Sequence, residues 1–119
     1  MKENNLTDRL LNFSVDTIKY LRYLPNNEEY RIIKYQLIKS VTSSGANYEE
    51  SQGGSSKKDF SNKVRISLKE MRETNYWLKV INGITEDDKL NQRCKNLIKE
   101  SYELRNILGA ICVKAEINK

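Results

Sequence analysis

One segment constrains the possible fold of this chain more than any other. Between residues 56 and 82, apolar and small side chains recur at alternating steps of four and three, at Phe60, Val64, Ser67, Met71, Thr74, Leu78 and Ile81. This spacing puts a continuous seam along one face of an α-helix, and such seams pack against neighbouring helices in bundles. The segment therefore predicts one long helix of a helical bundle.

Three other segments, at about residues 7–24, 28–52 and 86–117, repeat apolar side chains with the 3.6-residue period of amphipathic helices. Pro25 is predicted to end the first of them, because proline disfavours helical geometry at the residue before it. Gly53 and Gly54 are predicted to end the second. The connections between segments are short, so neighbouring helices are expected to run antiparallel.

Polar residues mark the predicted starts of the helices. Asn27 precedes two glutamates and Ser56 lies three residues before Asp59, so both are expected to act as N-caps. Thr85 precedes three acidic residues and is expected to cap the fourth helix. Gly83 is expected to end the third.

Chain length and composition agree with a single all-α domain. A chain of 119 residues has the size of one domain. It contains one proline and five glycines, fewer than the many tight turns of an all-β sandwich normally need. We therefore predict that residues 1–119 form one antiparallel, up-down-up-down four-helix bundle.

The absence of histidine limits the chemistry available to the chain, because it excludes histidine-dependent catalytic triads and histidine-ligated metal centres. Cys94 and Cys112 are predicted to lie about 27 Å apart on one helix, too far for a disulfide, and to serve as small buried side chains. Free thiols favour the cytoplasm. No signal peptide or membrane-spanning apolar run is apparent. We expect a cytoplasmic, non-enzymatic protein that binds no cofactor, metal or membrane.

Three motifs carry a resemblance to a known family. They read SVTSSGANYEE at residues 40–50, DF at 59–60 and LKEMRETNYWL at 68–78. They resemble the pattern S-x-x-S-x-x-A-N-x-x-E, D-F, L-K-E-A-x-E-T-x-Y-W-L of a bacterial four-helix-bundle family that includes proteins encoded in intervening sequences of 23S ribosomal RNA genes. The close match covers residues 40–81, and a looser one covers residues 97–108.

The resemblance implies a four-helix bundle that assembles into a homopentamer. The family is also similar to the accessory proteins of diversity-generating retroelements, which bind nucleic acid and a reverse transcriptase. The resemblance therefore implies three kinds of partner, namely further copies of this chain, RNA or DNA, and a reverse-transcriptase-like or other protein.

The residues themselves also favour self-association. Two segments carry more apolar side chains than one small bundle must bury: Leu11, Val15 and Ile18 in the first helix, and Ile32, Tyr35 and Ile38 in the second. These side chains are expected to be covered by other subunits. The number five comes from the resemblance alone.

Five polar residues at family positions are predicted to form a structural polar layer: Asn47, Glu50, Glu70, Glu73 and Thr74. Within each helix they are one turn apart. Antiparallel packing about the two glycines is expected to bring both sets to one level, where hydrogen bonds would fix the helix register. The alternative is a carboxylate cage for a metal ion, which the absence of histidine disfavours.

The net charge of +5 is concentrated in the third helix, where residues 56–82 hold seven basic and three acidic residues. A basic stripe follows steps of four and three and comprises Lys58, Arg65, Lys69, Arg72 and Lys79, with Asn62 and Tyr76 in the gaps. At 100° per residue it lies about 160° from the apolar seam. Glu73 is expected to pair with Lys69.

We predict that the basic stripe binds nucleic-acid phosphates without reading sequence. A solvated helix face is the alternative for the stripe. For the whole protein the alternative is a purely structural protein–protein interaction scaffold that binds no nucleic acid. The tyrosines and Trp77 are expected at subunit interfaces or at the edge of the core, with base stacking as the alternative.

Overall fold

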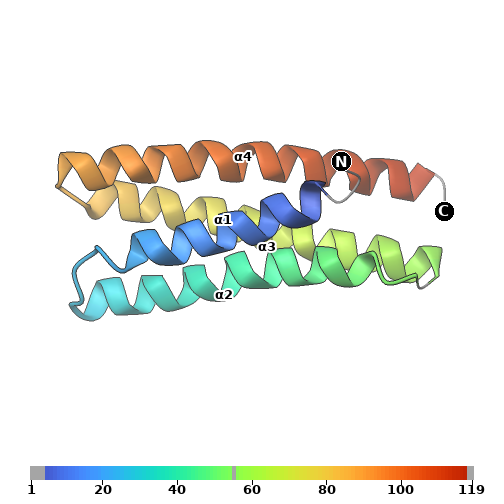
Figure 1. The fold of residues 1–119 in the computed structure, drawn as a ribbon, viewed down its shortest axis with the longest axis horizontal. Coiled ribbons are helices and arrows are strands. Elements are labelled where there is room, and N and C mark those ends of the chain that lie inside the picture. The colour runs from blue at the N-terminus through green and yellow to red at the C-terminus, as the bar shows by residue number, and fades with distance from the viewer. Residues whose placement is uncertain (1–4, 55, 118–119) are drawn as a thin grey trace.

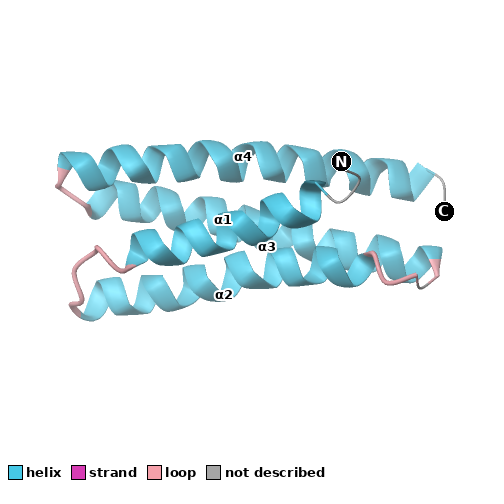
Figure 2. Cartoon of the chain, in the orientation of Figure 1, coloured by secondary structure: helices cyan, strands magenta, loops and turns pink. Residues whose placement is uncertain are grey.

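The computed structural model describes residues 5–54 and 56–117, the last without its side chain, and these residues form four helices. They are α1 (Asn5–Leu21), α2 (Glu28–Ser51), α3 (Lys57–Ile84) and α4 (Asp88–Ile117), and no strand occurs within the described ranges. Figure 2 shows only helices joined by short loops. The all-α fold is therefore as predicted. The domain predicted over residues 1–119 includes residues 1–4, 55, 118 and 119, which lie outside the described ranges.

The helices pack side by side, and each one reverses the direction of the one before it (Figure 1). α3 makes the most extensive contacts, with α2 on one side and α4 on the other. α1 packs on α2 and only sparsely on α4. Because α1 has 17 residues whereas α4 has 30, the C-terminal ends of α2 and α4 extend beyond it.

Two of the predicted caps are confirmed. The amide of Tyr30 donates to Oδ1 of Asn27 at 3.1 Å, and the amide of Asp59 donates to Oγ of Ser56 at 3.1 Å. Each cap satisfies a main-chain N–H that has no partner within its helix. Gly54 has a φ of 86° in the turn between α2 and α3, a conformation that glycine adopts without steric cost.

The start of α4 differs from the prediction. Oδ1 of Asp87 accepts from the Leu90 amide at 2.9 Å, so Asp87 is the cap. Thr85 instead ends α3, and its hydroxyl lies 2.9 Å from that of Tyr30. The prediction failed because this buried hydroxyl is engaged by α2 and is not available to the next helix.

The ends predicted from the sequence for two helices, α3 and α1, were also wrong. α3 continues through Gly83 to Ile84, because glycine weakens a helix without ending it unless the backbone turns left-handed. α1 ends at Leu21, three residues before the predicted end. Residues 22–24 continue as tight turns, each amide bonding to the carbonyl three residues earlier, as expected next to a proline.

The seam of α3 forms the centre of the core. The seam positions Val64, Ser67, Met71, Thr74, Leu78 and Ile81 are fully buried. Phe60, at the N-terminal end of the seam, is partly buried and packs against the core. Facing side chains from the other helices complete the core, among them Leu10, Leu37 and Leu108. Cys94 is buried as predicted and Cys112 is half-buried, and both are free thiols. No helix in the described ranges is long and apolar enough to span a membrane.

Small hydroxyl side chains line the contact between α2 and α3. Oγ of Ser44 donates to the carbonyl of Ser67 at 2.8 Å, and Oγ of Ser67 donates to the carbonyl of Ser44 at 2.7 Å. Farther along the same contact, one turn away on α2 and two turns away on α3, the hydroxyls of Ser40 and Thr74 lie 2.8 Å apart. These side chains let the two backbones approach closely, and every one of their hydroxyls is hydrogen-bonded, so burial leaves no polar group unpaired.

We expect Ser44→Val to lower the melting temperature more than Ser44→Ala. Alanine removes one inter-helix hydrogen bond, worth about 0.5–1.5 kcal/mol. Valine also forces extra volume between close backbones, which typically costs about 1–3 kcal/mol. Thermal melts followed by circular dichroism measure both effects, with the exposed Thr42→Val on the same helix as the control. A valine variant as stable as the alanine variant would contradict close packing at this position.

Candidate nucleic-acid interface

The structure puts all five residues of the basic stripe on the solvent-facing side of α3. Lys58, Arg65, Lys69, Arg72 and Lys79 are exposed, whereas the seam on the other side of the helix is buried. The angular separation expected from the sequence is therefore realised. The row runs for about 31 Å, since each residue adds 1.5 Å along the axis.

Most of the stripe carries uncompensated charge. Arg65 is the exception, because its Nη2 lies 2.6 Å from Oε2 of Glu116 at the end of α4. Among the described residues, the other four form no ion pair, and the predicted pair between Lys69 and Glu73 is absent. Four positive charges of the described chain thus face solvent without a carboxylate at ion-pair distance, although Lys69 lies near enough to Glu70 to oppose the rise in the pKa of that carboxyl.

α4 extends this surface. Nδ2 of Asn75 donates to Oγ of Ser101 at 2.8 Å and sets the two helices in register. The guanidinium of Arg105 lies 4.4 Å from the centre of the Tyr102 ring. Arg65 and Arg72 lie near enough to Cys112 to favour its thiolate, although burial, the larger effect, raises the pKa of that thiol. The cations of α3 therefore adjoin α4.

The aromatic residues divide between the core and the surface. Tyr20 and Tyr30 are buried, and Trp77 packs partly buried against the core, as predicted. Tyr76 and Tyr102 are instead exposed on the outer side of α3 and α4. The Tyr76 ring contacts Trp77 edge to face, with 5.2 Å between ring centroids. The basic stripe thus contains an exposed ring.

The predicted polar layer is not assembled. Thr74 lies at the level of Ser40, which is seven residues, or about 10 Å, from Asn47 along α2. The Asn47 amide donates within its own helix to the carbonyl of Ser43 at 2.9 Å, and Glu50 is exposed. Buried polar contacts between the helices are made by other residues, among them the Ser40–Thr74, Ser44–Ser67 and Asn75–Ser101 pairs.

Glu70 and Glu73 are half-buried on adjacent turns of α3. Burial, first, and then the charge of Glu73 raise the pKa of Glu70, while Lys69 and Lys39 oppose the shift. The Glu70 carboxylate makes no hydrogen bond to another described side chain or main-chain group. No cluster of three or more potential metal-ligating side chains occurs in the part of the chain that the structure describes.

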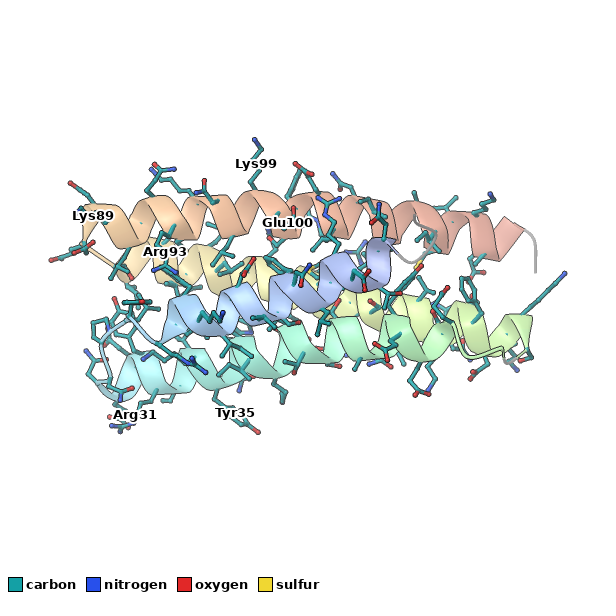
Figure 3. The ribbon with its side chains drawn as sticks, in the orientation of Figure 1. Arg31, Tyr35, Lys89, Arg93, Lys99 and Glu100 are labelled. Atoms are coloured by element: carbon teal, nitrogen blue, oxygen red, sulfur yellow. The ribbon has the colours of Figure 1, made fainter. Side chains whose placement is uncertain are left out.

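A groove between α1 and α4 was not anticipated from the sequence. It encloses about 780 Å³, and Figure 3 shows Arg93 and Glu100 on the α1 side of α4 while Lys99 projects away from the bundle. Arg9 spans the groove with bonds of 2.6 and 2.7 Å to Glu100 and one of 2.8 Å to Glu103. Arg9 is more than 90 residues from both glutamates in sequence, and no local sequence pattern predicts their contact.

Glu70→Gln should stabilise the protein at neutral pH. The raised pKa means that the folded state binds the Glu70 proton more tightly than the unfolded state does. At a pH above the ordinary carboxyl pKa, ionisation of Glu70 therefore opposes folding. The free energy of unfolding of the parent therefore falls as pH rises from the ordinary carboxyl pKa through the raised pKa of Glu70. Melting temperatures from pH 4 to pH 8 should show a benefit at neutral pH that shrinks on acidification. Equal benefit at both ends, or the same profile for the exposed Glu50→Gln, would contradict this assignment.

Comparisons with known proteins agree with the fold. The model of a family described as 23S rRNA-intervening sequence protein matches residues 2–110. Among solved structures, the chain is similar to a crystal structure from Bacteroides thetaiotaomicron of a protein with unknown function from the S23 ribosomal protein family. The two share 30% sequence identity and a TM-score of 0.77, over 90% of this chain and 97% of that one. No curated protein matches the sequence.

The family match extends well beyond the motifs at residues 40–78. It includes α1, which carries no motif, and α4 as far as residue 110. The four-helix arrangement is shared with the solved relative over nearly its whole length. The chain is therefore a member of the 23S rRNA-intervening sequence protein family.

Proposed function

We propose that this protein is a non-enzymatic nucleic-acid-binding protein, acting as a ribonucleoprotein accessory factor through the basic stripe of α3. One observation carries the proposal. Among the described residues, four cations that form no ion pair lie in a row on a surface that takes no part in the core. Such a row suits the regularly spaced phosphates of a nucleic-acid backbone.

Several features support binding without sequence preference. Lysine and arginine contacts to phosphates position a protein on nucleic acid but read no bases. Within the described residues, Arg65 is the one side chain of the stripe held by hydrogen bonds, and its partners are Glu116, Asn62 and Ser61, so none of the five is set toward a base edge. The solved relative is described as belonging to a ribosomal protein family, which favours RNA over DNA as the ligand.

Replacing Arg65, Lys69 and Arg72 by Gln should weaken binding to RNA and flatten its dependence on salt. Removing one phosphate-binding cation should change the log–log salt slope by about 0.7 on a single strand and about 0.9 on a B-DNA duplex. Fluorescence anisotropy at 50–200 mM salt measures both quantities. The matched control is Arg22, Arg31 and Lys39→Gln, which removes three exposed charges, one from the turn after α1 and two from α2.

The two triple variants separate stripe binding from general charge attraction. Loss confined to the stripe variant supports the proposal. Equal loss in both would assign the effect to net charge, and no binding by the parent at about 50 mM salt would leave the protein–protein scaffold as the function. Circular dichroism of each variant establishes that the bundle remains folded.

We further propose that the protein is a homo-oligomer, with five subunits as the family resemblance implies. The supporting observation is an exposed apolar face over α1 and α2. Leu11, Val15 and Ile38 are 58%, 40% and 37% exposed, and Tyr35 lies nearby on α2 at 63%. The two helices adjoin here, because Oγ of Ser14 donates to the carbonyl of Val41. This face also supports the alternative of a scaffold that binds only proteins.

Light scattering at micromolar concentration should give about five times the mass of one chain. Introducing charge at Leu11→Glu together with Ile38→Glu should dissociate the assembly, because a buried unpaired charge is costly. Val113→Glu is the matched control, since Val113 is 62% exposed on α4 and lies outside this face. A parent protein with the mass of a single chain would contradict self-association.

A further inference from the structure

We infer that the outer face of α3 and α4 takes single-stranded nucleic acid, and that Tyr76 and Tyr102 stack on its unpaired bases. The inference rests on the proposed function and names the class of ligand that the surface selects. It assigns these two tyrosines, which the sequence favoured for interfaces or the core edge, to the ligand instead. Three structural observations support it.

The first observation is that the two rings lie at one level on one side of the bundle. Asn75 of α3 and Ser101 of α4 are hydrogen-bonded across the helix contact. Tyr76 directly follows Asn75, and Tyr102 directly follows Ser101. A step of one residue turns a right-handed helix by about 100°. Because α3 and α4 run in opposite directions, that step turns both tyrosines toward the same outer side. They are 59% and 48% exposed.

The second observation is that each ring is supported from within the protein. Tyr76 rests edge to face on Trp77, which is itself packed against the core. Tyr102 is stacked with the Arg105 guanidinium at 4.4 Å. A ring held in this way loses little conformational entropy when it stacks on a base, and an arginine on a ring keeps its N–H groups for phosphates.

The third observation is the position of the cations around the rings. Arg72 lies one turn before Tyr76 and Lys79 one turn after it, in the uncompensated row of charge. A surface that alternates rings and cations suits a single strand, because the unpaired bases are free to stack on the rings while the phosphates contact the cations. A duplex keeps its bases stacked inside the helix and can use only the cations.

The other exposed tyrosines do not share this setting. Tyr35 is 63% exposed on α2 and has Lys39 over its ring at 5.7 Å, but it projects from the side of α2 away from the bundle (Figure 3). It lies within the apolar face proposed for self-association. Tyr23 lies outside both that face and the basic stripe, in the turn after α1, and is 67% exposed with the Arg93 guanidinium 4.9 Å from its ring centre. Tyr23 therefore serves as the matched control.

The test measures anisotropy with three RNA probes of about 20 nucleotides, a length that exceeds the site of one binding module, at one salt concentration. The probes are an unstructured single strand, its blunt duplex, and an abasic strand with the same phosphates. The parent should bind the single strand most tightly. Tyr76→Ala and Tyr102→Ala should each weaken that complex about tenfold, within the roughly 5- to 150-fold range for one base stack, and leave the other two unchanged. Tyr76→Phe should retain binding, and Tyr23→Ala should match the parent.

A second measurement uses the parent protein alone. Trp77 is the only tryptophan of the chain and contacts the Tyr76 ring. The single strand should therefore alter its fluorescence, whereas the abasic strand bound to the same extent should not. This readout remains informative even where an alanine variant is poorly folded.

The outcomes distinguish this inference from the proposed function. Parent-like binding of the single strand by both alanine variants, together with loss in the Gln stripe variant, would overturn base stacking and leave phosphate binding intact. Equal affinity of the parent for all three probes would do the same. Absence of binding to every probe would overturn both, and the face would then belong to a protein partner.

Discussion

The close approach of α2 and α3 is the contact on which the arrangement of the bundle depends. Ser44 and Ser67 each donate to the main-chain carbonyl of the other, which requires the two backbones to lie near one another. α3 in turn provides most of the surface on which α4 packs, and α1 lies alongside α2 and, more sparsely, α4. A larger side chain at either serine would therefore displace the helix that positions the rest.

This contact also determines how α3 presents its charge. With its seam buried against α2 and α4, the helix cannot rotate, so the basic stripe is fixed toward solvent. Arg65, Lys69 and Arg72 are like-charged neighbours three and four residues apart, an arrangement that mildly destabilises a helix. Burial of the seam outweighs that cost. A surface that keeps repelling charges while contributing nothing to the core is suited to binding an anionic partner.

Two different surfaces then serve two different proposed interactions. The exposed apolar side chains Leu11, Val15 and Ile38 lie over α1 and α2, whereas the cations and exposed rings lie over α3 and α4. Self-association through the first would leave the second open and repeat it on every subunit. Each added copy would add phosphate contacts, so an assembly would bind nucleic acid far more tightly than one chain does.

The sequence alone determined the features that follow from local spacing. Steps of four and three define both the seam and the basic stripe of α3, and the caps Asn27 and Ser56 act within one turn of their own helices. The motifs at residues 40–78 were sufficient to indicate the family. Angular position around a helix depends only on residue number, so these predictions needed no knowledge of the neighbouring helices.

Only the tertiary structure decided which residues meet across helices. It separates Asn47 from Thr74 by two turns, engages Thr85 with Tyr30, and joins Arg9 to Glu100. It also sets Tyr76 beside Tyr102, through the Asn75–Ser101 bond. Such contacts depend on the register between helices, which is set by the packing of side chains far apart in sequence. A shift of one turn would preserve every local pattern in the chain and change every one of these pairs.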